Sequence, residues 1–376
     1  MQTLAPQVVS AGRLPQPAEQ IADSVRVLDR AELAATPAAT VDGVLRGVPA
    51  FSLFRRSDSF SANPTAQGVS LRGLGPSGAS RSLVLLDGLP LNDPFGGWVA
   101  WTRVPRTSLD RVEIVPGGGA TAWGNAALGG VVQLLARHAT AREGSADVSY
   151  GAHATRSAEL SHTEPLGSGT LEVSARDFAT DGYPLVAPER RGLVDLAAWS
   201  RHRWAKLGWR QPLSSTVAWS TGMQSYREQR GNGTPYQRNN SRADTATLAF
   251  DGKNSDGLTW NVAAYAQDQS FASTFGSINA TRTIETPASD QFAVPAKAFG
   301  VQATAGWTQA DGGRTNLGAD TRAVRGETRE NFTFTAGNFT RLRVAGGNQQ
   351  LGGLFALHER PLAEDLRLTL GARLDR

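Results

Sequence analysis

Two kinds of residue alternate in the segment Phe299-Gly300-Val301-Gln302-Ala303-Thr304-Ala305-Gly306-Trp307. Every second position is apolar, and the positions between them are polar or glycine. A period of two puts alternate side chains on opposite faces of an extended strand. A run of about nine such residues is also what a tilted strand needs to cross a bilayer. The segment therefore predicts a long β-strand with one apolar and one polar face.

The same alternation recurs from residue 145 to the last residue. It is clear in Ser145 to Tyr150 and again in Leu366 to Asp375. Counting such stretches predicts roughly eleven strands between Ser145 and Arg376. Long polar segments interrupt them, and we expect these to be extracellular loops: Gly182 to Gly192, Glu228 to Arg242, and Ser273 to Lys297.

A soluble β-sandwich and a membrane barrel both show such alternation. Two observations favour the barrel. The strands are longer than the usual 5–6 residues of a sandwich strand. The polar faces also carry charged residues such as Glu159, Glu172 and Arg176, which suit a polar lumen. The pattern alone leaves open which face points inward.

Composition excludes several classes of function. The 376-residue chain has no cysteine, which rules out disulfides, a thiol nucleophile and cysteine metal ligands. Its 38 basic and 34 acidic residues are interspersed, so no nucleic-acid partner is predicted. No apolar run approaches the ~18 residues of a membrane helix. No signal peptide follows Met1, so for an exported protein we expect the true start to lie upstream.

The first part of the chain, before Gly144, has a different character. Short apolar runs separated by Gly and Pro predict small mixed-sheet strands at Ser82 to Leu86, Arg111 to Val115 and Gly130 to Leu135. One short helix is expected at about Ala38 to Leu45, with Thr36 and Pro37 at its start.

Six motifs in this part, in order, resemble the plug of TonB-dependent outer-membrane receptors. They are Leu28 to Leu33, Val44 to Ala50, Val69 to Leu74, Val84 to Asn92, Leu109 to Gly117 and Ala122 to Val132. The residues that carry the plug motifs are Arg72, Gly73, Asp87, Gly88, Glu113, Gly117, Gly124, Gly129 and Gly130. The sequence departs from the family pattern at Gly118 and Gly119, where Pro and a small polar residue are more usual.

The resemblance implies a mainly β fold in three parts. Residues 1–20 would be an N-terminal tail, 21–140 a small mixed α/β plug, and 145–376 a partial antiparallel transmembrane barrel. A barrel of about 22 strands at ~10 residues each needs about 220 residues before any loop is counted. The chain therefore predicts about half of such a barrel. Because it also ends at Arg376 inside an alternating strand, we expect a fragment.

The family also implies a TonB box, a short extended segment that pairs with the energy-transducing partner TonB. Pro6, Gln7, Val8, Val9 and Ser10 occupy the expected place and have β-strand character. An exposed extended segment can add a strand to a partner's sheet edge. The alternative is an ordinary disordered tail.

One plug loop is the predicted ligand contact. Asn92 to Trp101 is Gly-rich, polar and aromatic, and in the family such loops touch the ligand at the outer end. The predicted ligand-binding residues are Phe60, Asn92, Asp93, Phe95, Trp98 and Trp101. The alternative for the two tryptophans is packing against the barrel wall.

Plug arginines are also expected to meet inward barrel carboxylates such as Glu159 and Glu172. The arginines in question are Arg46, Arg55, Arg56, Arg72, Arg81, Arg103, Arg106 and Arg111. The alternative is that they are ordinary solvated side chains.

By resemblance, the function is TonB-dependent import across the bacterial outer membrane of a scarce ligand, such as a ferric siderophore or cobalamin. The expected partners are TonB, the metal chelate or similar small ligand, and outer-membrane lipid. No enzyme activity and no cofactor are predicted. The alternative is a non-transporting binding or signalling receptor, or a decayed, truncated gene product.

Other chemistry finds little support in the residues. Gly73 to Gly78 fits G-x-G-x-x-G, but a strand rather than a helix is expected to follow it, which argues against a dinucleotide site. The five histidines are scattered without metal-ligand spacing. No nucleophile motif is present.

Overall fold

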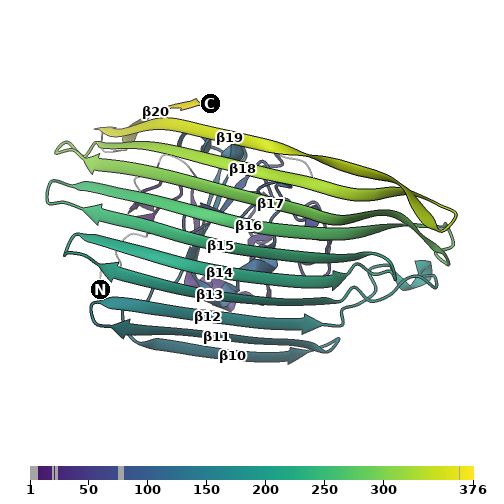
Figure 1. Cartoon of the computed structure of the whole chain (residues 1–376). Helices are drawn as coiled ribbons and strands as arrows, with labels where there is room; N and C mark the ends of the chain where they lie inside the picture. Colours follow the sequence, from purple (N-terminus) through teal and green to yellow (C-terminus); the bar gives the residue numbers. More distant parts are fainter. Residues whose placement is uncertain (1–6, 19–20, 22–23, 75–79, 364) are drawn as a thin grey trace.

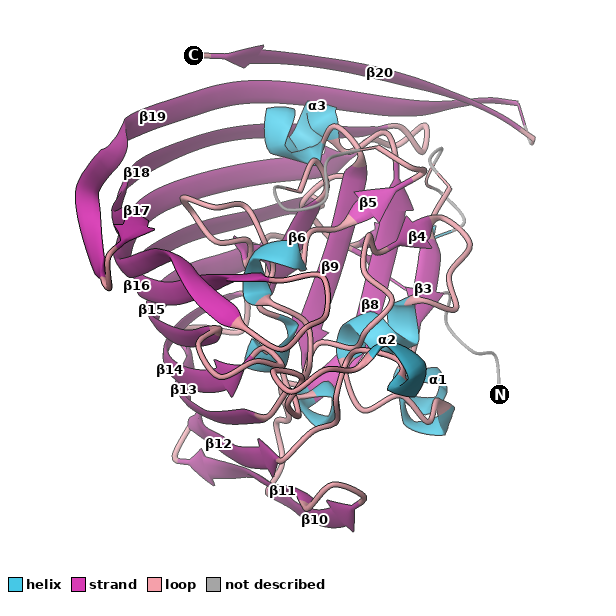
Figure 2. Cartoon of the chain, turned by 90° about the vertical axis from the view of Figure 1, so that its right-hand side faces the viewer, coloured by secondary structure: helices cyan, strands magenta, loops and turns pink. Residues whose placement is uncertain are grey.

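The structure, a computed structural model, describes residues 7–18, 21, 24–74, 80–363 and 365–376. A large curved sheet wraps around a smaller mixed domain, which lies on its concave side (Figure 1, Figure 2). Within these ranges, no helix has the length and apolarity needed to cross a membrane.

The smaller domain is built on a five-stranded sheet of order β3-β8-β9-β6-β7, in which only β6 and β9 run parallel. Its strands are β1 (Gln7–Val8), β2 (Gln16–Pro17), β3 (Arg26–Leu28), β4 (Phe51–Ser52), β5 (Ser70–Leu71), β6 (Leu83–Leu86), β7 (Leu89–Pro90), β8 (Leu109–Pro116) and β9 (Gly130–Ala136). Its helices are α1 (Arg30–Ala35), α2 (Val41–Leu45) and α3 (Ala120–Trp123). The three predicted strands are confirmed as β6, β8 and β9.

The helices differ from the sequence prediction. Helix α1, which was not predicted, begins at a capping box in which Asp29 and Glu32 each accept a hydrogen bond from the other's backbone N–H. Thr36 ends α1, and α2 begins only after Thr40. The prediction that Thr36 and Pro37 start a helix at residue 38 is therefore wrong, because the capping box starts a separate helix upstream.

The core of this domain lies between its sheet and helix α2. Leu45, Val112, Ile114 and Leu134 are all fully buried there. Where β9 begins, Gly130 has a φ of 121°, and a Cβ atom would lie 2.2 Å from the Val115 carbonyl oxygen. Only glycine fits this position, which brings β8 and β9 into register.

The large sheet has eleven antiparallel strands in sequence order, which confirms the predicted number. They are β10 (Glu143–Gly151), β11 (Thr155–Leu166), β12 (Gly169–Thr180), β13 (Ser200–Pro212), β14 (Val217–Gly231), β15 (Arg238–Lys253), β16 (Leu258–Ile278), β17 (Glu285–Thr308), β18 (Arg314–Thr335), β19 (Asn338–Ala363) and β20 (Leu366–Asp375).

The two ends of the sheet differ. Turns of two to five residues, such as 167–168 and 309–313, lie at one end, which we call the short-turn end. The opposite end holds the 181–199 loop and is called the long-loop end. It contains all three predicted loops, but two of them are much shorter than expected: 232–237 and 279–284. Their polar flanks continue as paired strands, because the ladder of backbone hydrogen bonds does not require an apolar face.

The faces of the sheet settle the orientation that the pattern left open. Phe299 and Leu207 point outward and are exposed, whereas Tyr265 and Ala298 point inward and are buried. Their inward cluster includes Leu89 of the small domain. The sheet is thus apolar on its convex face, as a membrane barrel requires and a soluble sandwich does not.

Candidate functional site

The predicted ligand loop has a well-determined backbone. The Asn92 side chain accepts a hydrogen bond from the Val84 N–H (2.8 Å) and donates to the Gly97 carbonyl (3.3 Å). The Asp93 carboxylate accepts from the N–H groups of Phe95 (3.0 Å) and Gly96 (2.6 Å). Burial raises the pKa of Asp93 above its ordinary value, although these two N–H groups oppose the shift. Both polar residues therefore hold the loop in shape.

The aromatic residues of this loop have separate environments. Trp98 packs on Phe271 of the sheet, with ring centroids 5.3 Å apart. Phe95 is 39% exposed and its ring fills the space beside Gly326, where a Cβ would lie 2.5 Å from it. Trp101 is 1% exposed in the core of the small domain. The indole of Trp101 is enclosed by core side chains in this structure, and its contact with a ligand stays a prediction.

Phe60 lies at the seam between the two regions. Its ring stacks on Phe178 of β12, with centroids 4.1 Å apart and planes 12° apart, and His202 of β13 lies behind it. Next to this stack, Arg230 of β14 donates to the carbonyls of Ser59 (3.0 Å) and Ala62. Phe60 thus packs against the wall of the sheet in this structure.

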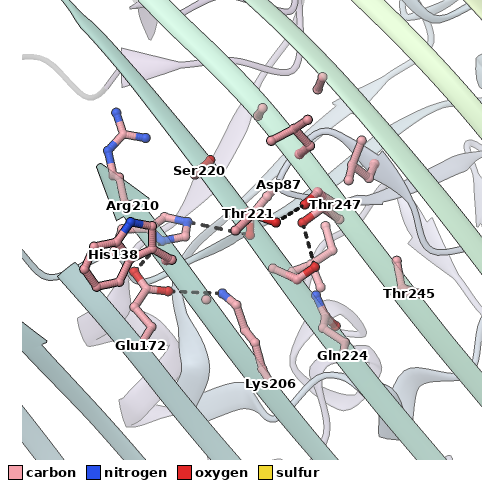
Figure 3. Close-up of a pocket in the computed structure, with 18 of the residues that line it drawn as sticks. Asp87, His138, Glu172, Lys206, Arg210, Ser220, Thr221, Gln224, Thr245 and Thr247 are labelled. Atoms are coloured by element: carbon pink, nitrogen blue, oxygen red, sulfur yellow. Dashed lines mark hydrogen bonds and ion pairs between the residues drawn. The ribbon is translucent and has the colours of Figure 1, made fainter. Parts of the chain in front are cut away.

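A polar chamber of about 240 Å³ lies between the β6–β7 hairpin and the inner face of β12 to β16, near the short-turn end (Figure 3). Its charged lining residues are Asp87, Arg103, His138, Glu172, Lys206, Arg210 and Asp251. Hydroxyl and amide side chains, among them Ser220, Gln224, Thr245 and Thr247, complete the wall. Such a lining suits water and polar solutes.

His138 connects the two regions at this chamber. Its Nδ1 lies 2.8 Å from Glu172 of β12, and its Nε2 lies 3.7 Å from Asp87 at the tip of the hairpin. Lys206 also approaches Glu172, at 3.4 Å. Burial alone would lower the pKa of His138, but the interactions with the carboxylates of Asp87 and Glu172 outweigh burial and raise the pKa to about 9. The imidazolium is therefore charged at neutral pH.

The N-terminal segment lies in the seam between the small domain and strands β17 to β20. The N–H groups of Val9 (2.9 Å) and Ser10 (3.0 Å) donate to the buried carboxylate of Glu113 in β8. Three residues later, Arg13 forms an ion pair with Asp320 of β18 (2.7 Å). The guanidinium also lies over the Trp123 ring, 4.6 Å from its centroid. The segment is therefore attached to both regions.

These contacts bear on the predicted TonB box. Pro6 lies outside the described residues. Gln7 and Val8 form β1, which pairs with β2 of the same chain, and Val8 and Ser10 are fully buried. The expected exposed strand is therefore absent from the described part, because the local hairpin and Glu113 already satisfy its backbone.

The plug-motif residues lie at turns and crossings of the small domain. Asp87 and Gly88 form the β6–β7 turn with positive φ, and Asp87 accepts from the Ala136 N–H (2.8 Å). Glu113 holds the N-terminal segment. The remaining motif residues occupy the turn after β5, the end of β8 and the approach to β9: Arg72, Gly73, Gly117, Gly124, Gly129 and Gly130.

The predicted pairing of plug arginines with barrel carboxylates is wrong for the two carboxylates named. Glu159 pairs with Arg176 of the sheet itself, and Glu172 with His138 and Lys206. Arg55 and Arg111 instead pair with carboxylates of their own domain. Sequence reasoning missed the charges that do cross the seam: Arg13, His138, Arg230, Asp320 and Arg373. For Arg230, Asp320 and Arg373, which lie in strands, the sequence feature that could have revealed these contacts is a charged residue on the inward face of the strand.

Comparison with known proteins agrees with this architecture. Residues 17–131 match the TonB-dependent receptor plug domain family. The vitamin B12 transporter BtuB of Vibrio vulnificus (strain CMCP6) is 29% identical over 184 residues, which cover 48% of this chain and 29% of that protein.

Solved structures share the fold of both regions. Pseudomonas aeruginosa FpvA, bound to a heterologous pyoverdine, superposes with a TM-score of 0.80 at 14% identity over 99% of this chain and 54% of that one. The alcaligin outer-membrane receptor FauA of Bordetella pertussis gives 0.72 at 15% identity, over 98% of this chain and 57% of FauA. The chain thus spans little more than half the length of these structures. The plug match, the shared order of plug and barrel strands, and the relatives together support a TonB-dependent receptor of the bacterial outer membrane.

Proposed function

We propose that the protein imports a scarce ligand, such as a ferric siderophore or cobalamin, across the outer membrane with energy supplied through TonB. The proposal rests on one observation above all. The N-terminal segment is hydrogen-bonded to β8 of the plug sheet, and β8 is joined through β9 to β6, the strand next to the polar chamber. The relatives' names, which include vitamin B12 and pyoverdine, support the class of ligand.

The contacts form a continuous path for force. Ser10 is bound to Glu113 in β8, β8 pairs with β9, and β9 pairs with β6. Strand β6 is followed by the turn residue Asp87, and the β6–β7 hairpin forms one wall of the chamber. Tension on the N-terminus would therefore displace the hairpin and enlarge the chamber next to the barrel wall.

We assign the parts of the chain accordingly. Residues 1–20 would form the TonB-contacting tail, with Pro6 to Ser10 as the box, 21–140 the plug and 145–376 barrel. Phe95 and Trp98, with Phe60, would contact the ligand after the outer plug loops leave the wall. Asn92 and Asp93 would keep the loop in shape.

The test is deletion of residues 2–11 in the full-length receptor, produced in cells that lack their own receptor for the ligand. Surface binding and uptake of a labelled ferric siderophore or cobalamin are measured on the same cells. We expect uptake to be abolished and binding to be unchanged, because the outer loops are remote from the deleted segment.

A Gly/Ser sequence of equal length in place of residues 2–11 serves as the matched control, because it keeps the tether length and removes the strand character. We expect it to fail as the deletion does. Uptake that survives both changes contradicts TonB-dependent import and favours a non-transporting binding or signalling receptor.

A further inference from the structure

A buried histidine in β13 packs as an aromatic ring at the seam between the small domain and the sheet. His202 is 2% exposed, and within the described residues neither its Nδ1 nor its Nε2 has a hydrogen-bond partner. Its ring stacks on Phe178 of β12, with centroids 4.5 Å apart and planes 18° apart. The ring of Phe60, from the small domain, lies 4.1 Å from Phe178 and 5.9 Å from His202, almost parallel to both.

Two guanidinium groups face this histidine. Arg176 of β12 lies over the Phe178 ring, 5.4 Å from its centroid, and Arg230 of β14 approaches from the other neighbouring strand. The carboxylates beside them are already bound, because Glu159 of β11 pairs with Arg176 (3.0 Å) and Glu228 pairs with Arg230. The surroundings of the imidazole are therefore cationic, with no carboxylate left over to balance another positive charge.

The other titratable groups around the stack do not provide an acceptor either. The hydroxyl of Tyr226 on β14 shares a hydrogen bond with the plug residue Thr102. On the plug loop, the Asp58 carboxylate accepts from the N–H groups of Phe60 (2.9 Å) and the following serine (3.0 Å). A proton on His202 would thus be a buried charge without a hydrogen-bond partner, so the stack requires the neutral ring.

The position of His202 along its strand exposes it to the pH of the external medium. Its neighbours Arg201 and Arg203 point outward near the long-loop end, and the Arg203 side chain is 83% exposed. Charged residues on the convex face place this level outside the apolar band. Burial first, and the two guanidinium groups next, lower the pKa of His202 well below its ordinary value.

Phe60 is the member of the stack that can move. Phe178 and His202 belong to β12 and β13, which are held by a ladder of backbone hydrogen bonds. Phe60 lies in a turn of the small domain, whose neighbouring residues Ser59 and Ala62 are bound to the sheet through a side chain of β14. The departure of Phe60 would admit water to the imidazole without breaking a strand.

We propose that His202 is an acid-sensitive switch, in which protonation of the imidazole displaces Phe60 and releases residues 58–62 from the sheet. A histidine that is neutral in the stacked state stabilises that state fully above about pH 6.5, and this stabilisation is lost as the pH falls. Each pH unit below about 6.5 shifts the equilibrium toward the released state by up to about tenfold. The switch concerns the seam alone, and only its bearing on Phe60 as a ligand contact rests on the proposed function.

The experiment measures hydrogen exchange at the amides of residues 60–62 in the full-length receptor, in detergent and without ligand. Rates at about pH 7.5 and about pH 5.0 are corrected for the intrinsic change of exchange with pH. We expect opening to increase by up to about thirtyfold at the lower pH, which lies about 1.5 units below 6.5. His202→Phe keeps an aromatic ring in the stack and removes the titrating nitrogens, so this increase should be lost.

Two further variants separate the switch from other effects of acid. His153→Asn removes an exposed histidine at the same end of the sheet, at a φ of 57° that Asn tolerates, and should keep the full response. Phe60→Ala should open the loop at both pH values and leave little response.

His202→Phe retains Asp58, so an equal response in that variant would assign the effect to another group and overturn the proposal. Unchanged exchange in the native receptor between the two pH values would overturn it as well, and so would loss of the response in His153→Asn. Neither ligand nor TonB takes part in the measurement, so failure of the switch leaves the transport proposal standing.

Discussion

The plug and the barrel sheet use apolar residues in opposite ways. In the plug, Val112 and Leu134 are fully buried and polar groups face outward. In the sheet, Phe299 and Leu354 are more than half exposed on the convex face, and charged residues such as Glu172 and Asp320 point inward. The plug therefore has a core of its own in a polar surround, whereas the sheet meets lipid outside and the plug inside.

The seam between them is held mainly by polar contacts. Arg230 binds plug carbonyls, Arg373 donates to the Ala122 carbonyl (3.2 Å), and Gln267 donates to the Pro90 carbonyl (2.8 Å). Hydrogen bonds of this kind exchange readily with water, at a net cost of about 1 kcal/mol each. The difference suggests a plug that moves as a folded unit while its seam rearranges.

The largest effect is expected for Trp101→Ala in the plug core. Loss of a buried indole leaves a cavity and should lower the free energy of unfolding of the plug by about 3–5 kcal/mol. The matched control Trp98→Ala, at the seam, should cost only about 1 kcal/mol. Denaturant unfolding of the full-length receptor measures both. Equal losses would show that the plug has no separate core.

Val301→Arg on the convex face should cost about 2–4 kcal/mol of membrane stability, since an outward arginine must lie in hydrocarbon. Gln224→Arg, which points inward to the chamber, should be tolerated because it meets water. Folding into lipid vesicles, followed by resistance to heat denaturation, compares the two variants. The reverse order would invalidate the assignment of the faces.

Asp320→Asn removes the carboxylate shared by Arg13 and Arg373. Because Arg13 is buried, loss of its partner should weaken the packing of the N-terminal segment between plug and sheet, by a free energy of about 2–3 kcal/mol. Limited proteolysis should then cut the first 20 residues faster. The exposed pair Asp268–Lys297 offers a control, in which Asp268→Asn should leave the cleavage rate unchanged.

The smallest effect concerns pH at the chamber. His138 faces Asp87, Glu172 and Lys206, and its pKa is raised to about 9. A raised histidine pKa contributes stability that is complete below about 6.5 and lost as pH rises through about 9. Because the side chain is half exposed, we expect about 1 kcal/mol or less. Hydrogen exchange at the Ala136 amide should show extra opening above pH 9, beyond the intrinsic increase, and His138→Gln should abolish this dependence.

Local pattern was sufficient for much of this fold. Period-two alternation located strands such as Phe299 to Trp307, because the side-chain period of a strand does not depend on its neighbours. Asp87, Gly88 and Gly130 were singled out only by the family resemblance, and the structure shows why the motif has them: all three have a positive φ.

Contacts between distant residues were not visible. Trp98 and Trp101 are three residues apart with similar neighbours, yet one lies at the seam and the other in the core. The ion pair of Arg13 with Asp320 joins residues 307 positions apart. The pairing of Glu172 with His138 depends on how the chain re-enters the sheet after the plug.

Periodicity acts over a few residues, so the two regions and the approximate number of barrel strands could be predicted from local pattern, and the plug motifs from their resemblance to a known family. The face that meets lipid, the accessible aromatic residues and the contacts of the N-terminal segment became clear only from the folded chain. Those properties depend on which residues face each side chain. The register of the curved sheet around the plug determines these neighbours.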